Sequence, residues 1–553
     1  MELPHRAVAR LAALALALAL LACAAVPAAA SAADLQHPES LTQPPRGYEL
    51  SAREVQRIAA RADKVQEAVK DGALQPAAYM KGPGRWQVSW FRDGDEIVQV
   101  QVDDRTGAVL EQWSGYQVAW SMARGYPGAF GRKLNAPYVW IPLCLLFIAP
   151  FVDVRRPFRL LHLDLLVLLA FGASHYFFNR GEIGVSAPLA YPVLLYLLAR
   201  VLFAAFRPRR PAGRLVPHAP LMLMVVGLMF LCAFRIGLNI ANSNVIDVGY
   251  AGEIGADRIV DGHPLYGDGF SADVERGDTY GPVTYLLYVP FEQALPWSGR
   301  WDDLPAAHGA AIAFDLLALG GLLLLGRRLR PGPDGTVLGV ALGYAWVAYP
   351  YTTFVLESNS NDTLVAVACV GALLAATMAR RHASAATSAL AVGLGAAAKF
   401  VTAALAPMFS RRSPVVFWVT LVLAVALVVV PFIPDGGLRE LYDRTIGYQA
   451  GRPSPFSIWG QVESLGWLQS VLKGMAAGLA ILAAFRPREP SLRQMAAMGA
   501  AILIAIELTA THWFYLYIVW FVPFVLVALL AAHSTGAREE TAEQEEEREA
   551  VFA

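Results

Sequence analysis

The stretch from Asn239 to Tyr285 carries the side chains best suited to chemistry. It follows an apolar run, Leu221 to Leu238, that is long enough to span a bilayer. Asp247 comes only a few residues after this run, and further acids, a histidine and several tyrosines follow. An ionisable group so close to hydrocarbon is costly, so function is its default explanation. We predict that Asp247 is a general base; the alternative is a solvated loop whose acids cap short helices.

Further polar side chains lie in segments that the topology described below places on the same side of a membrane. Carboxylates and amides suit sugar hydroxyls, aromatic rings suit sugar faces, and cations suit a phosphate. We expect the substrate to be bound by Tyr250, His263, Tyr280, Glu357, Asn361, Asp362, Lys399 and His512.

Lys399 and His512 are the positive charges expected near a phosphate leaving group, because a cation acts more strongly where water is scarce. Plainer explanations stay open: a snorkelling lysine, an interfacial histidine, and acids that cap the helix beginning at Thr363. Asp257 and Asp261 have no diagnostic ligand spacing, so no cofactor is expected and no metal is indicated, although a divalent metal stays open as an alternative.

Composition identifies the class of protein. Of 553 residues, 56% are hydrophobic and only 16% are charged. So much apolar surface does not fit inside a soluble fold of this size, which predicts a polytopic membrane protein. The formal net charge is +0, so nothing in the charge balance indicates nucleic acid.

The fold predicted from the apolar runs is mainly α, a polytopic helical bundle with about eleven spans. The runs are 138–152, 160–178, 187–206, 219–240, 310–326, 336–356, 362–379, 414–433, 467–485, 495–511 and 514–532. Arginine clusters between them belong on the cytoplasmic side. Alternating the spans from those clusters places the 239–285 loop, residues 357–362, the loop 434–463 and residues 511–513 outside the cell.

Two segments interrupt this alternation. The apolar stretch from Pro282 to Trp297 cannot cross without placing the next arginines outside, so we predict an interfacial or re-entrant helix interrupted by Pro290. The stretch from Ala385 to Met408 has arginines near both ends. A re-entrant hairpin that turns near 395–402 satisfies both ends and carries Lys399 toward the outer half of the membrane.

The two ends of the chain differ from the membrane part. Residues 1–33 read as a signal peptide or anchor helix, and 534–553 as an acidic, disordered cytoplasmic tail. Residues 34–129 predict a small extracytoplasmic α+β domain: a helix over Ala52–Val69, then strands at Trp86–Trp90 and Ile97–Val102 joined by an Asp93-Gly94 turn. The segment VQVDDRTGAVLEQW resembles the PepSY-type module, which implies a binding or regulatory domain without catalysis and with an unknown partner.

Residues 221–530, within a transmembrane domain expected at 130–533, carry ordered motifs that resemble another family. These are NVIDVGY with Asp247, DGHPLY at 261–266, YGP at 280–282, SNSNDTLVAV, GLGAAAKF with Lys399, and THWFYLYIVWF with His512. Together they resemble the GT-C class of membrane glycosyltransferases, particularly the polyprenyl-phosphate-mannose-dependent mannosyltransferases of actinobacteria.

The resemblance implies inverting transfer of a mannose-like sugar from a polyprenyl-phosphate donor, with Asp247 as base and no nucleotide-sugar site. It also implies a bacterial plasma membrane, an external active site, and a membrane lipid or cell-envelope glycan as acceptor. The acid-rich stretch 253–278 and the N-terminal module depart from the family pattern and leave the acceptor open.

Two other functions remain as alternatives. A lipid or solute transporter would use similar charges along a path through the membrane, but the sequence has no clear inverted repeat or matched pair of broken helices. A catalytically inactive membrane sensor would use the N-terminal module and keep the helices as a scaffold.

Overall fold

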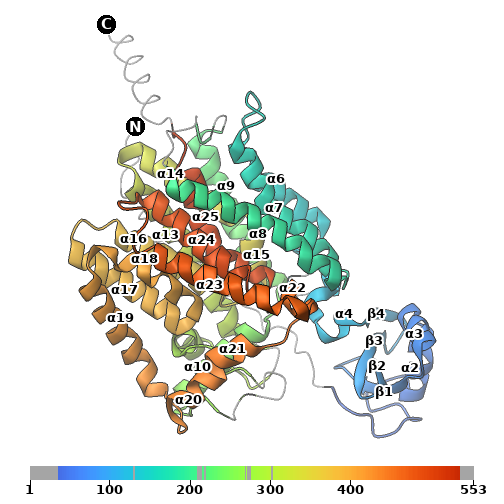
Figure 1. Ribbon diagram of the computed structural model, residues 1–553. Helices are drawn as coiled ribbons and strands as arrows, with labels where there is room; N and C mark the ends of the chain where they lie inside the picture. The colour runs from blue at the N-terminus through green and yellow to red at the C-terminus, as the bar shows by residue number, and fades with distance from the viewer. Residues whose placement is uncertain are drawn as a thin grey trace.

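The computed structural model describes residues 35–128, 131, 133–207, 214–216, 219–267, 270, 276–300 and 303–535 (Figure 1). The predicted signal segment, and the predicted tail beyond residue 535, lie outside the described residues. A small domain with a β-sheet comes first in the chain, and a large helical body follows.

The N-terminal domain contains one antiparallel sheet with strands in the order β1-β2-β3-β4. Its strands are Gln75–Met80 (β1), Arg85–Arg92 (β2), Asp95–Asp103 (β3) and Val109–Ser114 (β4). The predicted turn between β2 and β3 is confirmed: Asp93 and Gly94 have φ angles of 53° and 95°, as a tight two-residue hairpin requires. Alternate residues of the central strands, such as Val88 and Val100, are fully buried.

The single helix predicted over Ala52–Val69 is divided into Ala52–Ala59 (α2), Asp63–Ala68 (α3) and a 3-10 turn, Val69–Asp71. Ala62 interrupts it with an extended backbone, φ −64° and ψ 139°. Apolar side chains of both helices pack against the same face of the sheet, so the break bends the helix over the core without losing the predicted burial pattern.

Among the described residues, six helices are long and apolar enough to cross a membrane. They are Leu160–Phe178 (α7), Ile183–Phe206 (α8), Leu221–Asn242 (α9), Pro305–Leu329 (α13), Pro414–Phe432 (α19 and a 3-10 turn) and Glu463–Leu482 (α23 with a preceding 3-10 turn). Shorter apolar helices occupy Pro137–Phe151 (α6), Thr363–Ala376 (α16) and Tyr515–Leu530 (which includes α25). The mainly helical fold with candidate membrane spans is therefore confirmed, while eleven crossings and their orientation remain predictions.

The centre of the body is formed by Ile518–Leu530 (α25), whose side chains are all buried except that of Trp520, and Leu492–Glu507 (α24). Around them pack α8, α16, Gly332–Ala348 (α14) and Pro350–Glu357 (α15). The outer helix α19 instead exposes large apolar side chains, including Val415 and Leu427, both more than three-quarters exposed. An apolar outer surface of this kind fits hydrocarbon rather than water.

The two irregular segments are interrupted helices in the structure. Pro282–Leu286 (α11) and Val289–Ala294 (α12) are separated just before Pro290. Arg381–Ala398 (α17) ends at Lys399, inside the predicted turn, and the chain continues as a 3-10 helix, Phe400–Leu405, and one turn, Ala406–Phe409 (α18). The returning arm is thus shorter and less regular than a second α-helix.

Several helices that are not among these candidate spans lie at one end of the body. Figure 1 places Asp247–Val260 (α10), Gly437–Tyr442 (α20) and Tyr448–Gly451 (α21) there, with a π-helical turn, Asp443–Gly447, between α20 and α21. Ile458–Gln461 (α22) lies near the connection to the N-terminal domain, which includes Tyr116–Ala119 (α4), Ser121–Arg124 (3-10) and Gly125–Gly128 (α5).

A buried ion pair joins two of the long helices. Arg235 of α9 lies inside an otherwise apolar run and is 1% exposed; its Nη2 atom donates to Asp315 of α13 at 2.9 Å. Trp346 of α14 also donates its ring N–H to Asp315, at 2.9 Å. This contact therefore fixes three helices relative to one another.

Replacing Arg235 with methionine should destabilise the protein by about 3–5 kcal/mol, because Asp315 would remain buried without its cation. The measurement is unfolding in mixed detergent micelles followed by tryptophan fluorescence. The double variant Arg235→Met/Asp315→Leu should recover most of the loss. Equal stability of the single variant and the natural protein would contradict the role of the pair.

Candidate functional site

Asp247 is positioned by hydrogen bonds between two distant segments of the chain. The N–H groups of Asn244 and Ile246 donate to the carbonyl groups of Glu357 and Ser358, at 3.4 and 3.2 Å. The amide of Asn361 donates to the carbonyl of Val248 at 3.2 Å. These contacts hold the first turn of α10 against the turn that follows α15.

Small residues on one face of α10 permit this close packing. A Cβ atom on Gly249 would lie 2.3 Å from the carbonyl oxygen of Asn359, and one on Gly255 would lie 2.1 Å from the ring of Tyr285. Because side chains repeat every 3.6 residues, Asp247 projects from a different face. The glycine spacing therefore determines which side of α10 is packed and which side presents Asp247.

Lys399 and Asp362 form a buried ion pair at the ends of two apolar helices. Asp362 immediately precedes α16, and Lys399 immediately follows α17. The Asp362 carboxylate also accepts the ring N–H of Trp520 at 2.9 Å and the hydroxyl of Ser360 at 2.5 Å. The lysine head group is therefore fixed in place.

Tyr280 reaches the lysine because α11 packs on the end of α17. The Gly281 N–H donates to the carbonyl of Ala398 at 3.2 Å, and a Cβ atom at Gly281 would lie 2.0 Å from the carbonyl oxygen of Ala397. Only glycine permits that approach. The Nζ atom of Lys399 consequently lies 5.1 Å from the centre of the Tyr280 ring, a cation–π distance.

Asp247 shares this environment. Its side chain remains accessible to solvent although protein surrounds it on most sides, as expected on the wall of a cleft. Desolvation raises the pKa of Asp247, while the nearby charges of Arg452 and Lys399 oppose the rise. The carboxylate accepts one hydrogen bond, from the Val248 N–H at 2.9 Å. It is thus accessible, close to cations and open to a further donor.

Arg452 belongs to the site, although from the sequence it resembles a surface charge. Its guanidinium is close enough to influence Asp247, Tyr280 and His512. Within the described residues it forms no hydrogen bond or ion pair, whereas Lys399 is held by Asp362. The one sequence signal for Arg452 is its location in the loop 434–463.

His512 lies on the aromatic side of the site. Its Nδ1 atom is 2.9 Å from the hydroxyl of Ser454, and its ring is 5.6 Å from Phe456 and 6.5 Å from Trp120. Burial, with a smaller contribution from Arg452, lowers the pKa of His512 to about 3. The imidazole is therefore neutral near pH 7, so it offers a hydrogen bond and not the positive charge that we expected.

Trp120 comes from the connection between the N-terminal sheet and α6. In the same connection, Arg124 donates to the side chain of Gln99 on β3 at 2.9 Å, and its guanidinium lies 5.5 Å from the ring centre of Trp113 on β4. A Cβ atom on Gly125 would lie 2.9 Å from the carbonyl oxygen of Asn179, beyond α7. The connection is therefore attached to both parts, and the sheet supports a side chain beside His512.

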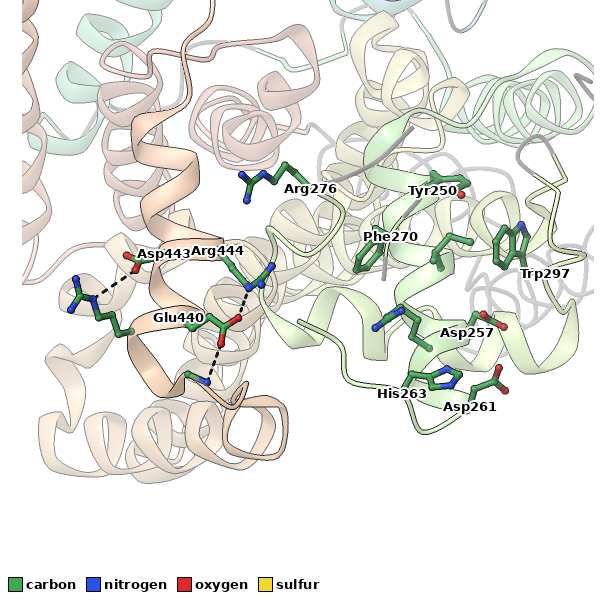
Figure 2. Close-up of a pocket in the computed structure, with 14 residues that line it drawn as sticks. Tyr250, Asp257, Asp261, His263, Phe270, Arg276, Trp297, Glu440, Asp443 and Arg444 are labelled. Atoms are coloured by element: carbon green, nitrogen blue, oxygen red, sulfur yellow. Dashed lines mark hydrogen bonds and ion pairs between the residues drawn. The ribbon is translucent and has the colours of Figure 1, made fainter. Parts of the chain in front are cut away.

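A separate cavity of about 1180 Å³ lies along α10 (Figure 2). Tyr250, His263 and Trp297 are on one side of it, and the α20 segment with Glu440, Asp443 and Arg444 is on the other. Tyr250 and His263 thus belong to this cavity and not to the cluster around Lys399. Tyr250 nevertheless follows Asp247 by three residues, so the two share one face of α10.

Glu357 lies deeper than the other candidate residues. Its side chain is completely buried, and neither carboxylate oxygen has a hydrogen-bond partner within the described residues. A Cβ atom on Gly131 would lie 3.1 Å from the Cβ atom of Glu357, so the chain leading to α6 covers this position. Substrate has no direct access to Glu357 in this arrangement.

Comparisons add no name to this site: no protein-family model matches the chain, and no curated protein matches it. Among the described residues, no group of three or more histidines, cysteines or acids is arranged to hold a metal ion. The site is therefore characterised by its own geometry, a carboxylate, a free guanidinium and a paired ammonium surrounded by aromatic rings.

Replacing Trp120 with alanine should raise the pKa of His512 from about 3 toward its ordinary value, because water would reach the imidazole and stabilise its charged form. The measurement is NMR titration of protein with ¹⁵N-labelled histidines, assigned with His512→Gln. Trp120→Phe, which keeps an aromatic cover, is the matched control and should titrate nearly as the natural protein does.

The same shift makes folding depend on pH. The unfolded chain binds a proton at His512 near pH 6.5, which the folded chain binds only near pH 3, so His512 destabilises the fold as pH falls through that interval. Trp120→Ala should reduce this component. Identical histidine titrations in Trp120→Ala and the natural protein would contradict the shielding role of Trp120.

Proposed function

We propose that the protein transfers a sugar, mannose-like in the family it resembles, from a polyprenyl-phosphate donor to an extracytoplasmic acceptor, with inversion. The observation that carries the proposal is the convergence of Asp247, Lys399 and Arg452, of which Asp247 begins α10 shortly after the apolar helix α9 and Lys399 follows α17. These groups come from three separate segments of the chain. A cleft at that level suits a substrate whose tail lies in lipid and whose head group is charged.

The chemistry assigns a separate role to each group. Asp247, as general base, takes the proton of an acceptor hydroxyl, because a neutral alcohol is a poor nucleophile. The hydroxyl oxygen forms a bond to the anomeric carbon from the face opposite the phosphate, and the bond from that carbon to the phosphate oxygen breaks. The products are the glycosylated acceptor and polyprenyl phosphate, and one attack from the opposite face inverts the anomeric centre.

The leaving phosphate gains negative charge, which cations stabilise strongly where little water is present. Arg452 is the principal candidate, since it has no protein partner among the described residues. Lys399 adds a second positive charge, partly compensated by Asp362. Neutral His512 donates or accepts a hydrogen bond at the edge of the same group. These roles differ because Arg452 has no partner among the described residues, whereas Lys399 is paired with Asp362.

The location is part of the proposal. We assign eleven crossings of a bacterial plasma membrane, with the N-terminal domain and the site outside and the C-terminus inside. Support comes from the arginine clusters between apolar runs and from the extramembrane helices α10, α20 and α21 at one end of the body.

Replacing Asp247 with asparagine or alanine should lower sugar transfer by about 10²- to 10⁴-fold, because the acceptor proton loses its base. The assay follows labelled polyprenyl-phosphate sugars incubated with purified protein and an envelope extract. Donor affinity should change little. The exposed acid Glu463, changed to glutamine, is the matched control. Full transfer by both Asp247 variants would exclude the mechanism and favour transport or sensing.

Replacing Arg452 with methionine should weaken binding of a short-chain polyprenyl-phosphate sugar roughly ten- to hundredfold, the loss expected for a hydrogen bond to a charged group. Calorimetry in detergent measures it directly. Arg53→Met, which removes an exposed arginine of the N-terminal domain, should have no effect. Unchanged donor affinity in Arg452→Met would remove Arg452 from the phosphate site.

A further inference from the structure

The cavity along α10 is adjacent to the proposed catalytic base yet distinct from the donor site. Asp247, Tyr250, Ile254 and Asp257 follow one another at helical spacing, and the last three line the cavity. From Asp247 to Asp257 the helix advances about 15 Å. A molecule that occupies the cavity therefore lies along the same helix face as Asp247.

The charges of the cavity wall are balanced. Its carboxylates are Asp257, Asp261, Glu440 and Asp443, and its guanidinium groups are Arg258, Arg276, Arg439 and Arg444. Arg444 is occupied by Glu440 at 2.7 Å and by Asp278 at 2.9 Å. The described residues of the wall carry no excess of cations that would attract a polyanion, and so polar a wall does not suit an acyl chain.

Two of the carboxylates are available to a ligand. Within the described residues, the side chains of Asp257 and Asp261 accept no hydrogen bond and form no ion pair. Partial burial, and after it repulsion by Asp261, raise the pKa of Asp257. Hydroxyl groups that donate to these oxygens would relieve both effects without bringing any charge.

Aromatic rings supply the complementary surface. Trp297 and Tyr250 both line the cavity, with ring centres 6.3 Å apart and planes at 85°. The backbone N–H of Trp297 donates to Glu292 at 2.7 Å, and its ring N–H donates to the carbonyl of Arg300 at 2.9 Å. The indole is thus held in position while one side faces the cavity, as in sites that bind the apolar faces of sugar rings.

We propose that this cavity binds the acceptor, and that the acceptor is an uncharged glycan chain of several sugar units. The volume of about 1180 Å³ exceeds the 300–1,000 Å³ typical of sites for one small molecule, which favours several rings over one. The hydroxyl to be glycosylated lies at the end of the chain nearest Asp247. The assignment of the glycan as acceptor rests on the proposed transfer reaction. Binding of a glycan in the cavity is testable without that reaction.

The direct test is binding of neutral hexose oligosaccharides, from trisaccharide to hexasaccharide, to the full-length protein by saturation-transfer NMR and tryptophan fluorescence. Trp297→Ala should weaken binding by about tenfold, as for a buried aromatic anchor. Asp257→Asn/Asp261→Asn should weaken it as well and should leave folding unchanged, because both acids lack hydrogen-bond and ion-pair partners among the described residues. Trp467→Ala, at an exposed tryptophan outside the cavity, is the matched control and should bind normally.

Transfer kinetics separate this proposal from the proposed function. Trp297→Ala and the double acid variant should raise the acceptor KM with little change in donor affinity, whereas Asp247→Asn should abolish turnover and leave oligosaccharide binding intact. Loss of transfer in Asp247→Asn together with unchanged oligosaccharide binding in both cavity variants would overturn the cavity proposal alone.

Tighter binding of a phosphorylated or sulfated oligosaccharide of equal length would overturn the assignment of an uncharged ligand. Glycan binding sensitive to Trp297, with normal transfer by Asp247→Asn, would retain the cavity as a glycan site and refute the proposed mechanism.

Discussion

The ion pair between Lys399 and Asp362 is the contact on which the arrangement of the site depends. It joins the end of α17 to the start of α16, and Trp520 attaches α25 to the same carboxylate. In surroundings with little water, separating the two charges would leave both uncompensated, which is strongly unfavourable. Tyr280 and Asp247 are placed relative to this contact, the first by packing on α17 and the second through the turn that ends at Asp362.

Charged groups in this protein are of two kinds. Arg235 and Asp315 neutralise each other inside the helical body, and Lys399 with Asp362 does so at its end. Arg452 differs, because it lies near Asp247 and forms no hydrogen bond or ion pair among the described residues. The paired charges hold helices together, whereas the unpaired charge of Arg452 is available to a ligand. Pairing therefore distinguishes the charges that stabilise the fold from the one that can bind substrate.

Local sequence patterns predicted the parts of the structure that depend on local physics. Apolar runs predicted the helices, Asp93-Gly94 predicted a hairpin, and the arginines near both ends of 385–408 predicted an interruption near 395–402, where α17 ends. The assignment of their segments to the same side of the membrane also predicted that Asp247, Lys399 and Asp362 would lie close together. The eleven crossings, however, depend on a bilayer and on helix tilt, which a hydropathy pattern does not determine.

The residues that sequence reasoning missed share one physical cause. Arg235 lies within an apolar run and was not singled out from the sequence, because its partner Asp315 lies on another helix. Arg452 and Trp120 lie in connections whose course follows from long-range packing, and neither has a local pattern. His512 was found, but its neutrality depends on rings contributed by distant segments. Such properties arise only when the chain has folded.

The contact between Trp120 and His512 also has a consequence for biosynthesis. Translation delivers the tryptophan early, before any of the long apolar helices, and the histidine almost last. The aromatic wall is therefore unfinished until the final helix has left the ribosome and inserted. A nascent or prematurely terminated chain has its sheet domain and Trp120 in place but no imidazole beside them, so the surroundings of His512 form only in a completed polypeptide.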